Sequence, residues 1–225
     1  GGSPAGVIKD HLIRQLHLDF HREIVMIRLS EKLPRQIAVA VSGGCDSMAA
    51  LDFLRRSHDV LVLHYNHGTE HADLAQDVVR EYCYKHGLKW AVEKNTTKPP
   101  KGESLENFWR MQRYGFFDTF RDGRQVVTCR HLDDVVETWL FSAMHGNPFL
   151  IPRNRDCYIR PFLQTRKEDF QKWCDRKNVK FIDDPSNCDT RFMRNFIRHE
   201  MVPKVLIVNP GIHKTISKKL THTEA

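Results

Sequence analysis

Between residues 36 and 144 the chain alternates short apolar runs with segments of helical periodicity. The pattern predicts strands at 36–41, 59–65, 88–93 and 125–129, and helices at 46–56, 72–85, 103–120 and 132–144. Runs that are apolar throughout indicate strands buried on both faces. Strand–helix–strand repetition predicts a parallel sheet with right-handed crossovers. The fold class is therefore α/β, a doubly wound Rossmann-like sheet, with ligands expected at the carboxyl ends of its strands.

The pattern changes on both sides of this core, which we place at residues 33–150. Apolar side chains at helical spacing predict an N-terminal helical leader over 1–32. Beyond the core we expect a helical C-terminal extension of the same domain over 151–211, with a loop at 147–156, a short extended piece at 158–163 and helices at 167–177 and 191–201. Pro203 and the turn at 209–211 are expected to end the last helix. We expect residues 212–225 to form a polar tail that is mobile from residue 217 onward.

Composition narrows the class of protein. No apolar run approaches the roughly 20 residues that span a bilayer, and no apolar core of signal-peptide type is present, so we expect a cytoplasmic location without a membrane partner. The six cysteines form no Cys-x-x-Cys pair, which favours free thiols over a zinc or iron–sulfur site. The net charge is +7, and residues 153–204 hold 13 Lys and Arg against 8 Asp and Glu. This surplus fits either a solvated face or a nucleic-acid surface.

The segment Ser42-Gly43-Gly44-Cys45-Asp46-Ser47 lies where the first predicted strand ends and the next helix begins. Its two glycines permit positive φ and a close backbone approach, and the free N–H groups of a helix N-terminus attract anions. These features favour a phosphate cradle. The alternative is a plain glycine turn in which Asp46 or Ser47 caps the helix. The loop has no lysine of the Gly-x-x-x-x-Gly-Lys type, so it is not the common NTPase loop.

Ser-Gly-Gly-x-Asp-Ser after a first strand resembles the pyrophosphate-binding loop of the N-type ATP pyrophosphatases, the PP-loop superfamily. The resemblance implies a fold of the adenine nucleotide alpha hydrolase type. It also implies ATP as the nucleotide and an adenylated intermediate formed with release of pyrophosphate. By the same resemblance, Asp46 helps to place Mg²⁺, and the residues that hold the pyrophosphate are Ser42, Gly43, Gly44, Asp46 and Ser47.

Two further segments resemble the tRNA(Ile)-lysidine synthetases. Residues 64–68, His-Tyr-Asn-His-Gly, are similar to that family's His-x-Asn/Asp-His-Gly, although two histidines here also fit a structured turn. Residues 106–114 are similar to its Glu-x-x-Ala-Arg-x-x-Arg-Tyr helix. The resemblance implies that His67 and Arg113 bind the nucleotide and that Arg110 and Arg113, on one helical face, steady phosphate charge. The alternative is that both arginines are surface charges.

Residues 129–138 are similar to the family's x-His-His-x-Asp-Asp-x-x-Glu-Thr segment, except that Arg130 replaces the first histidine and Val135 stands where glutamine is usual. Asp134 and Glu137 lie three residues apart on one helical face, so they need a counter-charge, which Mg²⁺ or a cationic substrate supplies. By the resemblance these two carboxylates bind the charged end of L-lysine. His131 is a candidate proton acceptor, because an attacking amine must lose protons.

Residues 184–198 match the family's Asp-Pro-Ser-Asn…Arg-Asn-x-Ile-Arg segment. Arg194 and Arg198 are expected to face the substrates; the alternative is a surface stripe. The resemblance covers about 35–211, and since bacterial members generally carry further C-terminal domains, we expect a short form of the family.

Three hypotheses follow. The first is a ligase that uses ATP and Mg²⁺ to adenylate the wobble cytidine of an isoleucine tRNA with a CAU anticodon, after which L-lysine attacks and AMP and pyrophosphate leave. The second is a PP-loop tRNA thiolation enzyme, in which Cys45 or Cys129 would act without a Cys-x-x-Cys pair. The third is a catalytically inactive nucleotide- or RNA-binding module, which would gain nothing from carboxylates beside phosphate. The oligomeric state stays open, with a homodimer as one option.

Overall fold

Six strands form a single sheet in the order β3-β2-β1-β4-β6-β5, in a computed structural model that describes residues 27–222. The strands are β1 Gln36–Ala40, β2 Asp59–Asn66, β3 Lys89–Lys94, β4 Gln125–Thr128, β5 Asn154–Arg155 and β6 Tyr158–Ile159. All neighbouring pairs are parallel except β5 with β6. The α/β fold with a mostly parallel sheet is therefore confirmed.

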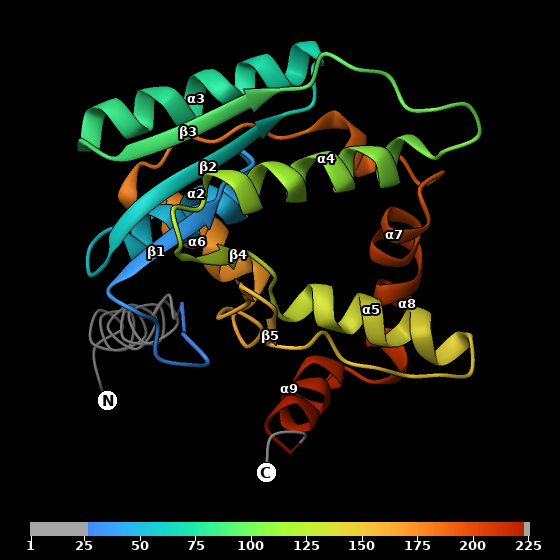
Figure 1. Cartoon of the computed structure of the whole chain (residues 1–225). Helices are drawn as coiled ribbons and strands as arrows, with labels where there is room; N and C mark the ends of the chain where they lie inside the picture. The colour runs from blue at the N-terminus through green and yellow to red at the C-terminus, as the bar shows by residue number, and fades with distance from the viewer. Residues whose placement is uncertain (1–26, 223–225) are drawn as a thin grey trace, which may run out of the picture.

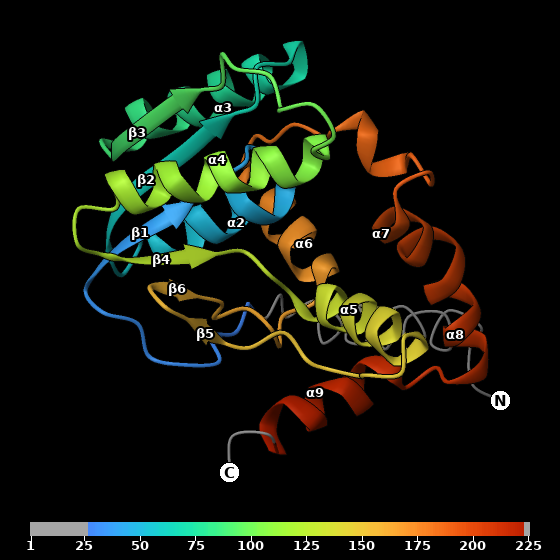
Figure 2. The ribbon, with the colours of Figure 1, turned by 45° about the vertical axis from the view of Figure 1, so that its right-hand side comes forward.

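Helices cover both faces of this sheet (Figures 1 and 2). They are α2 Cys45–Leu54, α3 Glu70–His86, α4 Leu105–Phe120, α5 Leu132–Met144, α6 Lys167–Lys177, α7 Met193–Phe196, α8 Val202–Val208 and α9 Ile212–His222. A 3₁₀ turn, Pro185–Cys188, precedes α7, and a π-helical turn, Ile197–Met201, joins α7 to α8. Within residues 27–222 none of the helices combines the length and the apolar character needed to cross a bilayer.

Strand β1 shows why the sheet is buried on both sides. Ile37 and Val39 point into a core shared with α2, α3 and α6, whereas Ala38 points into a second core shared with α4. All three side chains are at most 1% exposed. Because successive strand residues alternate between faces, an uninterrupted apolar run is what two covered faces require. Burying a side chain such as Ile37 contributes about 2 kcal/mol.

Two strand predictions need correction. β3 was expected to be buried on both faces, but most of its residues are exposed, since it is an edge strand that pairs with β2. Its charged ends, Lys89 and Lys94, suit that position. The predicted loop at 147–156 contains the short strand β5, which forms a hairpin with β6 around Asp156, a residue with a φ of 56°. Two-residue strands are too short for a periodicity to reveal them.

The C-terminal predictions were wrong in two places. Pro203 does not end a helix; it lies in the first turn of α8, where the N–H that proline lacks would have no helical partner. The expected polar tail forms helix α9, which buries Ile212, Ile216 and Leu220 against α5 and α8. These residues lie four apart; between them Lys214, Thr215, Lys218 and Lys219 are exposed, whereas His213 is buried. Most of the predicted leader lies outside the described residues, and residues 27–35 form no helix or strand.

Candidate active site

The loop of residues 42–47 joins β1 to α2 at the carboxyl edge of the sheet. Gly43 has a φ of 89°, and a Cβ built on it would lie 2.9 Å from Cβ of Ala75 on α3. Gly44 begins α2 without any side-chain cap. The first-turn N–H groups of α2 therefore lack side-chain acceptors, and this arrangement suits an anion. Only glycine fits the tight passage beside α3.

The two serines of this loop bind each other. Ser47 Oγ accepts from the backbone N–H of Ser42 at 3.1 Å and donates to Gly44 O at 3.0 Å. The two hydroxyl oxygens lie 3.0 Å apart. In this arrangement the hydroxyl groups shape the loop, which leaves the backbone N–H groups as the main anion donors.

Neighbouring segments hold the loop from two sides. The backbone N–H of Ile182 donates to Gly43 O at 2.9 Å. The thiol of Cys129, at the end of β4, donates to Asp46 O at 3.2 Å. The segment that leads into residues 184–198 is thus fixed directly over the glycines. The sequence does not reveal the Ile182 contact, because a backbone N–H donates in the same way whatever side chain the residue carries.

Asp46 and His131 connect the loop to helix α5. Oδ2 of Asp46 lies 3.5 Å from Nε2 of His131, while Oδ1 of Asp46 is buried and has no hydrogen-bond partner among the described residues. A carboxylate oxygen left open beside an anion cradle is the donor type that Mg²⁺ prefers. No cluster of three or more His, Cys, Asp or Glu within residues 27–222 could hold a metal by itself, so phosphate oxygens would have to complete such a site.

His131 also begins helix α5. Its Nδ1 accepts the backbone N–H of Asp134 at 3.3 Å, and the carboxylate of Asp134 accepts the backbone N–H of His131 at 3.2 Å. Burial lowers the pKa of His131, but the carboxylates of Asp134, Asp46 and Asp133 outweigh it and raise the pKa. With Nδ1 in the cap and Nε2 against Asp46, the ring has no free lone pair. This geometry fits a positioning residue better than the proton acceptor that the sequence predicts.

The two predicted substrate carboxylates are paired with the two predicted arginines. Asp134 and Glu137, each 4% exposed, lie on one face of α5. Arg194 on α7 donates to Asp134, and its Nε lies 3.2 Å from Glu137 Oε2. Arg198 binds Glu137 Oε1 at 2.7 Å. Both arginines therefore bind buried carboxylates, and the Arg194 side chain stays 42% exposed. Burial raises the pKa of Asp134, but His131 and Arg194 outweigh it and lower the pKa to about 2.

His67 follows β2 and lies against α4. Its ring centroid is 4.9 Å from that of Trp109, and its Nδ1 is buried without a hydrogen-bond partner among the described residues. Burial and the charge of Arg113 lower the pKa of His67 to about 4, so the ring is neutral at pH 7. A neutral ring with one open nitrogen can accept or donate a hydrogen bond to a ligand.

Arg110 and Arg113 share one face of α4, as predicted. Both guanidinium groups lie over the Tyr114 ring, at 4.9 Å and 5.9 Å from its centroid. Arg110 is exposed, and it lies close enough to Arg130 to affect its pKa. Cation–π contacts leave the outer face of a guanidinium available to an anion. The helix therefore brings two cations toward the carboxyl edge of the sheet.

A contact that the sequence did not predict supports the start of α5. Asp133 accepts from the backbone N–H of Lys167 at 2.8 Å, and its Oδ1 lies 3.1 Å from Nε2 of His213 on α9. Burial raises the pKa of Asp133, but His213, Lys167 and His131 outweigh it and lower the pKa well below its usual range. His213 lies in the segment expected to be a polar tail, so no sequence pattern pointed to it.

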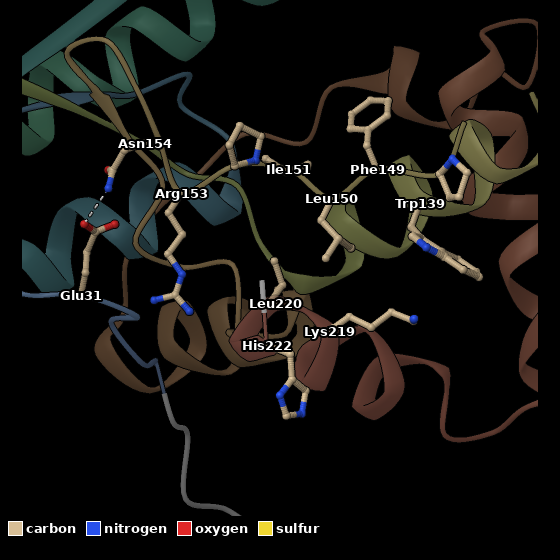
Figure 3. A pocket seen from close by; sticks show the side chains of 12 residues that line it. Glu31, Trp139, Phe149, Leu150, Ile151, Arg153, Asn154, Lys219, Leu220 and His222 are labelled. Carbon is tan, nitrogen blue, oxygen red and sulfur yellow. Dashed lines mark hydrogen bonds between the residues drawn. The ribbon is translucent and has the colours of Figure 1, made fainter. Parts of the chain in front are cut away.

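A cavity of about 1110 Å³ lies elsewhere, between α9 and residues 148–154 (Figure 3). Apolar side chains such as Trp139 and Leu150 line it together with Arg153 and Lys219. None of the predicted site residues is among its lining. In Figure 1 the arrows of the parallel strands β1 to β4 point instead toward the side where α7 lies. The predicted residues of the 42–47 loop, α5 and α7 meet on that side.

Comparison with known proteins shows which family this chain resembles. The family model described as a PP-loop domain matches residues 16–205. The tRNA(Ile)-lysidine synthase of Vibrio parahaemolyticus is 30% identical over 81% of this chain and 45% of its own length. The synthase of Francisella tularensis subsp. holarctica is 28% identical over 89% of this chain and 54% of its own length. The synthase of Polaromonas naphthalenivorans is 32% identical over 86% of this chain and 62% of its own length. The chain spans about half the length of the curated relatives it matches.

Proposed function

This chain belongs to the PP-loop domain family, and on that premise we propose that it is an ATP-dependent ligase of the tRNA(Ile)-lysidine synthase type. Its substrates are then ATP, L-lysine and an isoleucine tRNA with a CAU anticodon. The carbonyl oxygen at C2 of the wobble cytidine is a poor leaving group, and ATP supplies the activation by adenylating it. The ε-amino group of lysine then displaces AMP. A cytoplasmic location, where tRNA is found, is part of the proposal.

The 42–47 loop takes the pyrophosphate end of ATP in this proposal. Its backbone N–H groups and the N-terminus of α2 supply donors and positive potential. Asp46, with Oδ1 open, would hold Mg²⁺ together with the phosphate oxygens, and the ion would neutralise charge on the leaving pyrophosphate. His67, neutral at pH 7, and Arg113 lie at the end of β2 and on α4, where they would contact the rest of the nucleotide.

The cluster of Asp134, Glu137, Arg194 and Arg198 takes free lysine. A zwitterionic amino acid carries an ammonium and a carboxylate, and this cluster offers both complementary charges within one set of ion pairs. Binding would exchange arginine–carboxylate contacts within the protein for contacts with the substrate. The α-ammonium and the α-carboxylate of lysine would replace protein groups of equal charge, which limits the desolvation cost, while the ε-amino group must reach the acceptor uncharged.

One observation carries the proposal: His131 joins the two halves of the site. Its Nε2 faces Asp46 of the loop at 3.5 Å, and its Nδ1 caps the helix that bears Asp134. In this proposal the phosphate cradle and the amino-acid-binding cluster meet at one side chain, His131. Such proximity is what transfer of an amine to an adenylated acceptor requires.

The experiment is incorporation of labelled L-lysine into tRNA in the presence of ATP and Mg²⁺. A transcript with the CAU isoleucine anticodon is compared with the same transcript carrying another anticodon. We expect incorporation into the first alone, and its loss in Asp134→Ala with ATP binding largely retained. Pyrophosphate release without lysine incorporation would move the proposal to another acceptor. Absence of both would favour an inactive binding module.

The cysteines give no support to thiolation as a rival function. The Cys45 thiol lies 3.9 Å from Cys174 Sγ, and its hydrogen bond to Cys174, followed by burial, raises the pKa of Cys45 far above its usual range. Burial likewise raises the pKa of Cys129. Sulfur transfer needs a thiolate nucleophile, and both sites disfavour one. Cys45→Ser and Cys129→Ser variants should therefore keep lysine incorporation.

A further inference from the structure

Arg130 directly follows β4 at the carboxyl edge of the sheet, where its backbone N–H donates to Thr128 O at 3.0 Å. The segment it belongs to resembles a pattern that has histidine at this position. The Arg130 side chain is 31% exposed, and its Nη1 lies 3.9 Å from Oδ2 of Asp134. Because a guanidinium remains charged at every physiological pH, this position carries a permanent cation.

Asp134 cannot neutralise this cation alone, because it already pairs with others. Arg194 and Arg198 both contact Asp134, and both also contact Glu137. Two buried carboxylates therefore face three guanidinium groups. The contact of Arg130 is the longest of the five that join these residues. Among these five residues one positive charge is in surplus, while Asp46 acts on Arg198 from the 42–47 loop.

Further cations approach Arg130 from other elements. Burial lowers the pKa of Arg130, and the charges of Arg194 and Arg110 lower it further, against the opposite effect of Asp134. Arg160, buried after β6, is also close enough to be affected by Arg130. Like charges that converge from α4, β4, β6 and α7 repel one another, and an anion placed among them relieves the repulsion.

We propose that Arg130 binds a phosphate group of a substrate, at a position beside the Asp134–Glu137 pair and separate from the 42–47 loop. The proposal deepens the proposed function and rests on it for the identity of the substrates. A planar guanidinium donates two parallel hydrogen bonds to phosphate oxygens, which is the geometry that lysine or histidine cannot supply. The phosphate comes either from the nucleotide or from the backbone of the RNA, and the two sources are separable by experiment.

The test measures two affinities of the full chain without lysine. One is the Kd of a non-hydrolysable ATP analogue with Mg²⁺ and no RNA; the other is the Kd of an anticodon stem-loop RNA without nucleotide. Arg130→Ala should weaken one of them by about 10-fold or more, as expected for the loss of a charge-assisted bidentate contact. The matched control is Arg155→Ala on β5, which removes an equally charged but 68% exposed side chain and should change each Kd less than about 2-fold.

The affected ligand identifies the source of the phosphate. If Arg130→Ala weakens binding of the ATP analogue and leaves RNA binding unchanged, the phosphate belongs to the nucleotide. If the variant weakens RNA binding and leaves analogue binding unchanged, the phosphate belongs to the RNA backbone. In that case the slope of log affinity against log salt should fall by about 0.7 for the lost contact. Either result supports the proposal. Unchanged affinities for both ligands in a variant with a normal unfolding midpoint would overturn it.

Arg130→His separates binding from a purely structural role. The wild-type Kd should change little between pH 6 and pH 8. The histidine variant should bind more weakly than the wild type at pH 6 and lose up to about 10-fold more by pH 8, because its ring loses its charge there. If the Kd of Arg130→His equals that of the wild type at every pH from 6 to 8, the proposal is contradicted, even if Arg130→Ala fails to fold. Since neither affinity involves lysine, failure of lysine incorporation in the wild type leaves this test unaffected.

Discussion

Arg198 donates a hydrogen bond of 2.7 Å from Nε to Oε1 of Glu137, across 61 residues of sequence. Glu137 is almost fully buried on α5, and Arg198 lies in the π-helical turn that follows α7. The turn matters for this contact, because a π-helical turn changes the direction in which successive side chains point. The contact fixes the C-terminal helices against the site, so stability and substrate binding depend on the same charges.

Removing one partner of this pair should destabilise the protein. Arg198→Ala leaves the buried Glu137 carboxylate with Arg194 as its remaining cation, and we expect a loss of about 3 kcal/mol in the free energy of unfolding. Urea unfolding of the wild type and the variant measures this difference in the free energy of unfolding. Adding Glu137→Gln to Arg198→Ala should recover part of the loss, because the neutral amide needs no counter-charge. Fully additive effects of the two changes would show that the pair is not coupled.

Loss of the Asp46 carboxylate should lower the rate of pyrophosphate release more than the affinity for ATP. Asp46→Asn keeps the shape of the loop but removes the charge that would hold Mg²⁺, so pyrophosphate release should fall by at least about 100-fold. The Kd of ATP measured in EDTA should stay within about 3-fold of the wild type, since no metal is present to lose. The Mg²⁺ concentration that gives a half-maximal rate of pyrophosphate release should also change in Asp46→Asn. An unchanged Mg²⁺ dependence in this variant would show that Asp46 does not bind the metal.

The sequence predicts the helices and central strands of the core closely, because their apolar periodicity comes from burial on known faces. α5 and α6 begin and end at the predicted residues. It also predicts that Asp134 and Glu137 share a face, since helical spacing is a local property. The elements that it misses, β5 and α9, depend on partners far away in sequence. A two-residue strand exists because β6 lies beside it, and α9 is ordered by contact with α5.

The sequence likewise does not predict the ion pairs that balance the charges of the site. Each carboxylate and arginine of residues 134–198 can be named from its motif. The motifs do not reveal that these side chains neutralise one another. Nor does the pattern reveal that both nitrogens of His131 are engaged, because the cap at Asp134 and the contact to Asp46 depend on three-dimensional placement. Tertiary contacts therefore change the role assigned to a residue whose position was predicted correctly.

Gly43 and Gly87 provide a matched pair for the loop. Both have positive φ, at 89° and 63°, but a Cβ at Gly43 would lie 2.9 Å from Ala75, whereas a Cβ at Gly87 would meet nothing within 4 Å. Gly87→Ala should cost about 1 kcal/mol of stability from backbone strain and leave ATP binding unchanged. Gly43→Ala adds the clash and should weaken ATP binding by at least about 10-fold. Equal ATP affinities in the two variants would argue against the loop as the phosphate site.

A buried carboxylate outside the site should govern the acid stability of the fold. Asp52 on α2, 2% exposed, accepts hydrogen bonds from Arg55, Arg56, Tyr82 and Trp173. Burial raises its pKa, but these hydrogen bonds, that of Tyr82 foremost, outweigh it and lower the pKa to about 2.

Because the folded pKa of Asp52 lies below the value of about 3.9 in an unfolded chain, its contribution is present above pH 4 and is lost as the pH falls toward 2. The contribution at neutral pH is about 2 kcal/mol. Urea unfolding at intervals from pH 7 to pH 2 should therefore show the wild type losing more stability below pH 4 than Asp52→Asn, whose amide does not titrate. Parallel pH profiles for the two proteins would mean that other carboxylates control the acid transition.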